Sequence, residues 1–322
     1  MSWFLFAAIS LLGWGFADLF YKKGTDDADP QSHLKIAVWV GLVMGVCALI
    51  LIPFSETFSS GASMASILSA AWRYAPASIS YIVSMVIGYA GLRYLELSIV
   101  SPVQNASGAL SALCMILFFL FRGDKDILSS FSSLDITGTA LIVAGVIALA
   151  IVERRLDAVL LETDENDRKY KKGALALLFP ILYCVFDTVG TAADGILLDG
   201  EAGLGFGEID ILVLYGLTFL LAGLIAWIWI RVSTGKFYNP FTKKETPKAI
   251  AACCEEFGQI FYVYAMSLNP VLAAPMIGSY CIVSVLLSRF VVKEKLTRLQ
   301  YLCVSVVILG IVLLGISEGV TE

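Results

Sequence analysis

Long apolar stretches of about 20 residues alternate with short connectors along the chain, and a helix of that length spans the hydrocarbon core of a bilayer. Backbone polar groups must be hydrogen-bonded within the bilayer, so such stretches predict transmembrane helices. The connector from Ser55 to Trp72 is longer and amphipathic, which allows a short helix on the membrane surface. The predicted spans are 3–21, 34–54, 76–95, 99–121, 134–153, 173–195, 209–231, 247–268, 271–291 and 298–317.

The composition agrees with a membrane environment. Hydrophobic residues make up 58% of the 322 residues and charged residues 15%, compared with about 25% charged in soluble proteins. The basic residues lie in the connectors and form no continuous patch, which argues against nucleic-acid binding. The expected fold class is therefore an all-α polytopic membrane protein with ten transmembrane helices.

A charged connector at 154–172 divides the predicted helices into two sets of five, at 1–153 and 173–322. Of the 22 lysines and arginines, all but Arg73, Arg122 and Lys125 fall on one side of the predicted membrane. Positively charged connectors remain in the cytoplasm, so this side is expected to be cytoplasmic and both termini outside. The expected location is a bacterial-type plasma membrane.

An odd number of helices per set makes the second set start from the opposite face, so two related sets would be inverted repeats. A shift of 173 residues superposes Pro102 on Pro275, which gives the predicted fourth and ninth helices the same type of start. The same shift also superposes Tyr89 on Tyr262, Leu95 on Leu268, Ser111 on Ser284 and Leu113 on Leu286. A shift of 169 aligns Trp14 and Asp18 with Tyr183 and Asp187.

Four segments resemble the ten-helix, EamA-type permeases of the drug/metabolite transporter superfamily. They are Leu12–Asp18, Tyr94–Ser107, Tyr264–Pro275 and Val292–Thr297, the last followed by a glycine-containing helix. The resemblance implies two inverted five-helix repeats and alternating access to a central cavity, lined mainly by the third, fourth, eighth and ninth helices. The sequence Arg122–Lys125 departs from the Gly-Glu-Lys-like turn of that family, and the resemblance identifies no substrate.

Two adjacent glutamates lie deep in the predicted eighth helix. At 1.5 Å per residue, Glu255 and Glu256 are about 12 to 14 Å from its start, near the membrane midplane. Ionisable groups at this depth usually face a cavity or one another. Adjacent residues point about 100° apart, and Glu255 shares its face with Gln259 and Tyr262, so Glu255 is the favoured cavity residue. The alternative is an interhelical hydrogen bond from a protonated carboxyl.

Aspartates occur with aromatic residues in the first and sixth helices. Asp187 lies on a stripe with Tyr183, and Asp18 lies on a stripe with Trp14. For Asp18, the alternative is an ion-paired helix end beside the following lysines. Asp194, near the end of the sixth helix, is expected at the membrane surface.

Polar residues are frequent in the fourth helix and recur in the ninth. Such surface must face protein or water, although Ser-mediated helix packing accounts for many such residues. The predicted substrate-binding or coupling residues are Glu255, Glu256, Gln259, Tyr262, Asp187, Tyr183, Asp18, Trp14, Asn105, Gln104, Tyr89, Ser279 and Tyr280.

Carboxylates beside aromatic rings suit an amine-bearing or cationic solute, because the rings add cation–π attraction. They equally suit proton binding, and the sequence does not separate these roles. The expected function is a secondary transporter of a small polar or amine-bearing metabolite, with protons as a candidate coupling ion and no cofactor. A channel, a structural subunit and a lipid-modifying enzyme are the alternatives. The only histidine, His33, lies in a polar connector, and neither a hydrolase motif nor a P-loop is present, so no enzymatic activity is expected.

Overall fold

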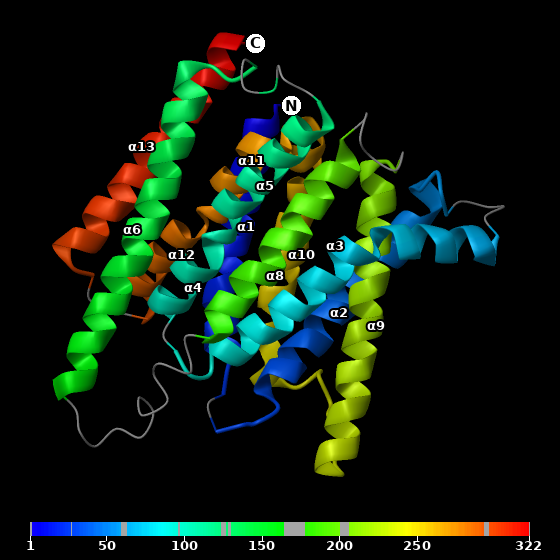
Figure 1. Cartoon of the computed structure of the whole chain (residues 1–322). Coiled ribbons are helices and arrows are strands. Elements are labelled where there is room, and N and C mark those ends of the chain that lie inside the picture. Colours follow the sequence, from blue (N-terminus) through cyan, green and yellow to red (C-terminus); the bar gives the residue numbers. More distant parts are fainter. Residues whose placement is uncertain are drawn as a thin grey trace.

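The computed structural model describes residues 2–26, 28–58, 63–95, 97–123, 127, 130–163, 178–199, 206–292 and 296–321. These residues form a bundle of helices without strands (Figure 1). The helices of the first half are α1 (Trp3–Gly24), α2 (Ser32–Leu51), α3 (Met64–Gly91), α4 (Leu97–Asn105), α5 (Ser107–Arg122) and α6 (Ser133–Thr163). Those of the second half are α8 (Leu178–Leu198), α9 (Glu208–Thr234), α10 (Thr246–Leu268), α11 (Pro270–Gly278), α12 (Cys281–Leu287) and α13 (Arg298–Thr321).

Eight helical stretches in the described part are long and apolar enough to cross a membrane. They lie at 3–24, 32–54, 100–122, 133–152, 178–198, 208–234, 270–291 and 298–320. The chain is therefore described as a polytopic membrane protein. The remaining two expected positions, in the third and eighth spans, are occupied by α3 and α10, which are helical but more polar than the other eight. Of the expected linker, residues 154–163 continue α6, and residues 164–172 lie outside the described part.

Helix α3 contains the second part of the expected surface segment, from Met64 to Trp72, and most of the expected third span, which it follows to Gly91. It begins where the side chain of Ser63 accepts a hydrogen bond from the backbone N–H of Ser66, at 3.1 Å, and it continues through Pro76. Its first turns project sideways from the bundle (Figure 1), and Trp72 on them is 80% exposed. The amphipathic segment is thus the beginning of a longer helix that extends into the bundle.

The fourth and ninth expected helices are interrupted. One breaks between α4 and α5 at Ala106, and the other between α11 and α12 at Ser279 and Tyr280. The two breaks lie against each other, since a Cβ on Gly278 would lie 3.1 Å from both Asn105 O and Gly108 Cα. Interrupted backbone at membrane depth is tolerated where protein or a water-filled cavity surrounds it.

The helix pairs follow a regular scheme. Helix α2 packs mainly against α9, α6 against α13, α5 against α11, α1 against α10, and α3 against α8. Figure 1 shows α6 and α13 side by side. Each of the first five expected helices can be exchanged with the helix at the same position in the second five. This exchange leaves the pairs α2–α9, α5–α11 and α6–α13 unchanged, and it converts α1–α10 into α3–α8. Glycines face each other in four of the pairs, at Gly13 with Gly258, Gly41 with Gly223, Gly108 with Gly278, and Gly138 with Gly310.

Glycine at position 41 allows the backbones of α2 and α9 to touch. A Cβ there would overlap Phe219 O and lie 2.8 Å from Gly223 Cα, and neither backbone atom can move independently. We expect Gly41→Ala to lower the free energy of unfolding by about 1 to 3 kcal/mol, as overpacking does. The measurement is thermal unfolding in detergent.

Gly319→Ala is the matched control, because nothing lies within 4 Å of a Cβ at this helical position. Alanine is a better helix former than glycine, so this variant should be unchanged or slightly stabilised. Equal effects of the two substitutions would contradict the packing argument.

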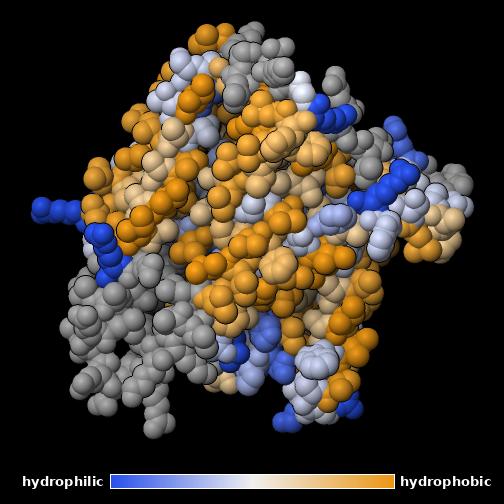
Figure 2. Space-filling view, in the orientation of Figure 1, coloured by the Kyte–Doolittle hydropathy of each residue, from blue (hydrophilic) through white to orange (hydrophobic). Residues whose placement is uncertain are grey.

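The surface of the bundle is mainly hydrophobic. Apolar side chains cover most of the face seen in Figure 2, and hydrophilic residues are concentrated at its periphery. Large apolar residues with high exposure include Phe121 at 88% and Ile228 at 64%, as expected for side chains that face lipid. The two ends of the chain lie at the same end of the bundle (Figure 1), where Trp3 Nε1 donates a hydrogen bond to Glu318 at 2.5 Å.

Candidate functional site

A cavity of about 50 Å³ lies at the centre of the bundle, where helices of both halves meet. Helices α1, α3, α8 and α10 contribute to its wall together with the two interrupted helices. The lining residues are Trp14, Asp18, Tyr21, Tyr81, Met85, Gly88, Tyr89, Leu92, Gln104, Asn105, Ser107, Gly108, Tyr183, Asp187, Thr191, Tyr215, Glu255, Tyr262, Ala274, Ile277, Gly278 and Tyr280. This volume holds a few water molecules, since one requires about 10 to 15 Å³.

Two aspartates of the cavity are held by serines of the interrupted helices. Asp18 Oδ2 accepts hydrogen bonds from Ser101 Oγ at 2.5 Å and from Ser284 Oγ at 3.0 Å. Asp187 Oδ2 accepts a hydrogen bond from Ser107 Oγ at 2.6 Å. Asp18 does not form the ion-paired helix end that the sequence allowed. Its carboxylate is buried and accepts hydrogen bonds from these serine hydroxyls. Both aspartates therefore connect a continuous helix to an interrupted one.

The two adjacent glutamates of α10 face different surroundings. Glu255 lines the cavity, and its carboxylate lies beside the hydroxyl of Tyr21. Glu256 does not line the cavity and lies toward α2, beside the thiol of Cys47. Both side chains are buried, at 7% and 9% exposure. The helical rotation of about 100° between neighbours places one carboxylate inside the cavity and the other in the α2–α10 contact.

Eight aromatic residues surround the three carboxylates, all but one of them tyrosines. The ring of Trp14 lies 5.1 Å from that of Tyr262 and 5.8 Å from that of Tyr280, measured between centroids. Tyr21 and Tyr89 are 4.8 Å apart on the same measure. No lysine, arginine or histidine in the described part of the chain lines this cavity. The site is thus acidic, aromatic and without a basic partner.

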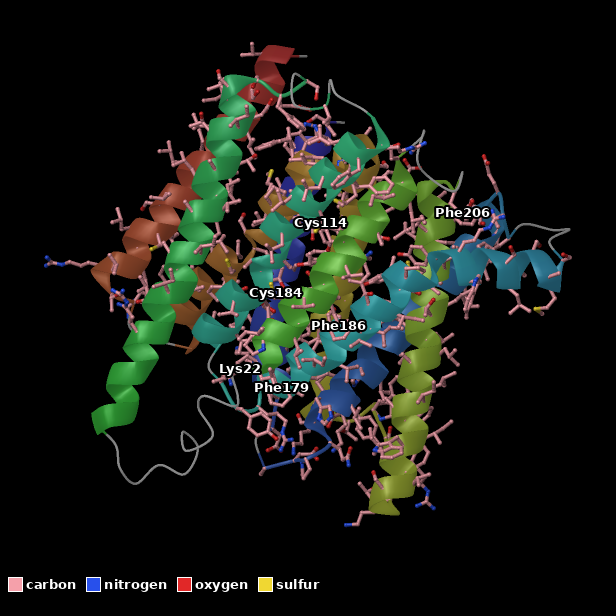
Figure 3. All side chains as sticks on the ribbon, viewed as in Figure 1. Lys22, Cys114, Phe179, Cys184, Phe186 and Phe206 are labelled. Carbon is pink, nitrogen blue, oxygen red and sulfur yellow. The ribbon has the colours of Figure 1, made fainter. Side chains whose placement is uncertain are left out.

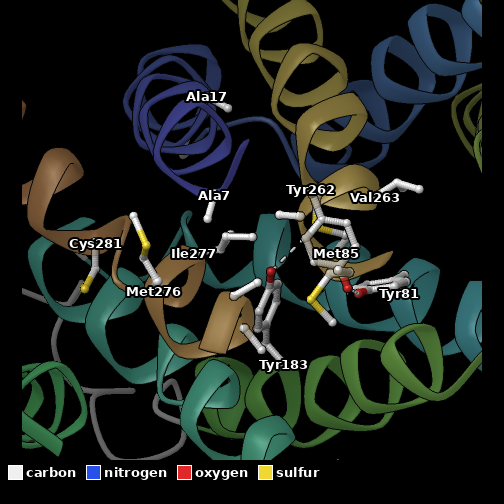
Figure 4. Close-up of a cluster of buried hydrophobic side chains, with 14 of the residues drawn as sticks. Ala7, Ala17, Tyr81, Met85, Tyr183, Tyr262, Val263, Met276, Ile277 and Cys281 are labelled. Carbon is white, nitrogen blue, oxygen red and sulfur yellow. Dashed lines mark hydrogen bonds between the residues drawn. The ribbon is translucent and has the colours of Figure 1, made fainter. Parts of the chain in front are cut away.

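Tyr81, Tyr183, Tyr262 and Met85 point toward one another in the interior (Figure 4). Tyr81 and Tyr262 share a hydrogen bond of 2.5 Å between their hydroxyls, and the Tyr183 hydroxyl lies 3.7 Å from the sulfur of Met85. The Tyr81 hydroxyl is also 3.1 Å from that of Thr191. These contacts join α3, α8 and α10 on one side of the cavity.

Trp14 and Tyr183, which a shift of 169 residues superposes, occupy comparable places. The indole of Trp14 lies over Gly258 of α10, where a Cβ would be 2.6 Å from Nε1. The ring of Tyr183 lies over Gly88 of α3, where a Cβ would be 2.7 Å from the ring. In each case an aromatic residue of the first helix of a set covers a glycine of the third helix of the other set.

Ten of the thirteen residues predicted from the sequence line the cavity, and Glu256, Gln259 and Ser279 do not. Gln259 is buried at 1% exposure, and Ser279 donates a hydrogen bond to Met276 O at the helix break. Sequence reasoning missed the lining residues Tyr21, Tyr81, Thr191 and Tyr215. Tyrosines are common at the ends of membrane helices, so their type alone does not distinguish a cavity from an interface.

One end of the bundle is closed by polar contacts. Lys22 Nζ donates hydrogen bonds to Leu92 O at 2.7 Å and Leu95 O at 2.8 Å, joining the end of α1 to the end of α3. Figure 3 shows Lys22 at the same end as Phe179. Lys244 Nζ lies 2.9 Å from Asp26 Oδ2, and this hydrogen bond lowers the pKa of the exposed Asp26 carboxyl.

A vestibule lies toward the other end of the bundle, where α8 ends and α11 begins. It has a volume of about 510 Å³ and is lined by Phe119, Arg122, Gly123, Ile127, Ser130, Phe131, Asp199, Leu268, Asn269, Pro270 and Val271. Asp194, expected at the membrane surface, lies one turn from the same end of α8 but is completely buried in protein. Within the described residues, no group of three or more His, Cys, Asp or Glu side chains is arranged to hold a metal ion.

Comparisons with known proteins support the fold only. No protein-family model matches the chain, and no curated protein is similar to it in sequence. A solved structure described only as "Crystal structure of protein" superposes with a TM-score of 0.61 at 12% sequence identity, over 99% of this chain and 98% of that one. The whole chain therefore has a fold found in a solved structure.

Proposed function

We propose that this protein is a secondary-active transporter of a small cationic or amine-bearing solute. The observation that carries the proposal is the central cavity, in which three carboxylates and eight aromatic rings lie without a basic residue of the described chain. A cation would neutralise the carboxylates, and the aromatic faces would attract it further. Buried carboxylates without a compensating charge are costly, so the site favours binding of a cation or of protons.

The proposed mechanism is alternating access between two inverted five-helix repeats. Its support is the pairing scheme, which is unchanged when the two sets exchange, together with the facing glycines of three helix pairs that map onto themselves, α2–α9, α5–α11 and α6–α13. Serines related by the 173-residue shift also act alike, since Ser111 Oγ contacts Thr188 O on α8 and Ser284 Oγ contacts Gly15 O on α1. Interrupted helices at a central site are typical of such transporters.

Within this proposal the chain is a ten-span, EamA-type permease, and α3 and α10 are the two more polar spans. The polar residues of α3 and α10 are accounted for in this proposal, because the carboxylate of α10 and the tyrosines of both helices face the cavity and not lipid. The cavity must expand during the cycle, since about 50 Å³ is far below the roughly 300 to 1,000 Å³ of ordinary ligand sites. The structure then corresponds to a conformation in which the cavity is contracted.

The test uses purified protein in liposomes and a panel of radiolabelled primary amines and quaternary ammonium compounds, with sugars and organic anions for comparison. We expect saturable uptake of at least one cationic compound, competed by its unlabelled form, and no uptake of the anions. Uptake of cations that rises linearly with concentration would indicate a channel. Absence of flux for every compound, with the protein folded, would contradict the transport proposal.

A further inference from the structure

Side chains of four helices lie between the central cavity and the vestibule. Helix α5 passes from Ser107 in the cavity through Met115 to Phe119 in the vestibule, and α8 passes from Thr191 through Gly195 to Asp199. Helices α10 and α11 contribute Met266 and Pro270 at the same level, and both methionines are completely buried. We call these four residues, Met115, Gly195, Met266 and Pro270, the outer layer.

The outer layer closes at Gly195. A Cβ on this residue would overlap the sulfur of Met115 and lie 2.9 Å from Pro270 Cβ and 3.2 Å from Met266 Cε. The absence of a side chain therefore allows three apolar groups from three other helices to meet against α8. This contact lies between the central cavity and the vestibule.

The residue before Gly195 is the fully buried Asp194, on a different face of the same turn. Tyr74, Tyr81 and Tyr262 lie near its carboxylate, but neither carboxylate oxygen has a hydrogen-bond partner, and no ion pair includes it, within the described residues. The other titratable groups near it are Tyr215 of α9 and Asp187 on its own helix. None of these tyrosines and aspartates carries a positive charge.

A chain of hydroxyl groups leads from the central cavity toward Asp194. Tyr81, Thr191 and Tyr262 line the cavity, and their hydroxyls are joined at 2.5 Å and 3.1 Å through Tyr81. Tyr81 and Tyr262 also lie near Asp194, whose carboxylate oxygens form no hydrogen bond within the described residues. Hydroxyl groups both donate and accept, so this chain can pass a proton between the cavity and the carboxylate once a tyrosine hydroxyl rotates onto Asp194.

We propose that Asp194 is a proton site that controls the outer layer, separate from the carboxylates that line the cavity; only its role in opening a path for the solute rests on the proposed transport function. With the proton bound, the neutral carboxyl is compatible with the closed, dry layer. When the proton leaves, an unpaired charge remains in a site without water, which is costly. Opening the layer hydrates that charge, so proton release favours opening toward the vestibule.

The test measures the layer itself and needs no transported solute. Met266→Cys places a thiol in the layer, and Ser130→Cys places one at an exposed position in the vestibule. Alkylation of each by a membrane-impermeant methanethiosulfonate is followed by mass spectrometry at pH 6 and pH 9, with and without Asp194→Asn. The rate at Ser130→Cys corrects for the pH dependence of the thiol.

With Asp194 present, the corrected rate at Met266→Cys should rise about tenfold from pH 6 to pH 9, a shift of about 1.4 kcal/mol in the opening equilibrium. With Asp194→Asn it should change less than about twofold. Equal pH dependence in both backgrounds would overturn the proposal, as would a pH-independent rate in both. Thermal unfolding establishes that each variant is folded, and Asp194→Glu, which retains the acid, should restore the pH dependence.

This result is independent of the uptake assay. If the layer responds to Asp194 and no cation is transported, the transport proposal fails and the proton site stands. If cations are transported and Asp194→Asn does not change the pH dependence of alkylation in the layer, only the proton-site proposal is contradicted.

Discussion

Glu255→Gln should weaken binding of a cationic solute by at least about 30-fold, or about 2 kcal/mol, because truncating one partner of a buried charge pair costs that much or more. Glutamine keeps the size of the side chain and removes the charge at the cavity wall. Binding only to the folded state raises the unfolding temperature by mass action. The measurement is the thermal shift produced by the cation that the uptake panel identifies.

Glu256→Gln is the control for this prediction. Glu256 is the next residue of the same helix and is equally buried, but it lies toward Cys47 outside the cavity. We expect it to bind the cation within about twofold of the unmodified protein, a change of less than about 0.5 kcal/mol. If both substitutions weakened binding equally, the effect would come from helix packing and not from the cavity. If neither weakened it, Glu255 would have no part in recognising the cation.

Lys248→Met should lower the free energy of unfolding by about 3 to 5 kcal/mol, since it leaves a buried carboxylate without its partner. Lys248 Nζ lies 2.7 Å from Glu245 Oε2, and their side chains are 3% and 6% exposed. Tyr238 also donates a hydrogen bond to this carboxylate at 2.9 Å. Thermal or denaturant unfolding in detergent measures the loss.

Lys244→Met distinguishes burial from charge. Its ion pair with Asp26 has a similar length, 2.9 Å, but the lysine side chain is 72% exposed. Exposed pairs contribute about 0 to 1 kcal/mol, so this variant should unfold at nearly the temperature of the unmodified protein. The double variant Lys248→Met/Glu245→Gln should recover part of the stability, because the orphaned charge is removed. A double variant no more stable than Lys248→Met would mean that lost packing explains the effect.

The sequence predicted the positions of the helices well, because each long apolar stretch satisfies its own backbone hydrogen bonds. It also favoured Glu255 over Glu256 from the neighbours on each helix face, because helical periodicity is a local property; Glu255 and Tyr262 line the cavity, whereas Gln259 of the same predicted stripe does not. The prediction divided α3 at Pro76, but the structure continues the helix through that residue. A proline within a helix can be accommodated, so this boundary was not decided by local sequence alone.

Other features depended on contacts between distant helices. Asp194 was expected at the surface from its place near the end of α8, and its burial results from tyrosines of α3 and α10. The interruption at Ala106 follows an asparagine and precedes a serine and a glycine, a polar and small sequence that signalled a cavity but not a break. The outer layer could not be predicted, because it joins residues that lie on four helices.

The glycine contacts of the bundle have a mechanical consequence if the two sets are related by a two-fold axis, as proposed. The pairs α2–α9 and α6–α13 each map onto themselves under that relation, and each contains facing glycines. Such crossings are pivots, because their contacts are the same whichever side is open. The pairs α1–α10 and α3–α8 map onto each other, so one should loosen as the other tightens. The preference for one side would then depend on residues that differ between α1–α10 and α3–α8. The pivots would contribute rigidity without favouring either side.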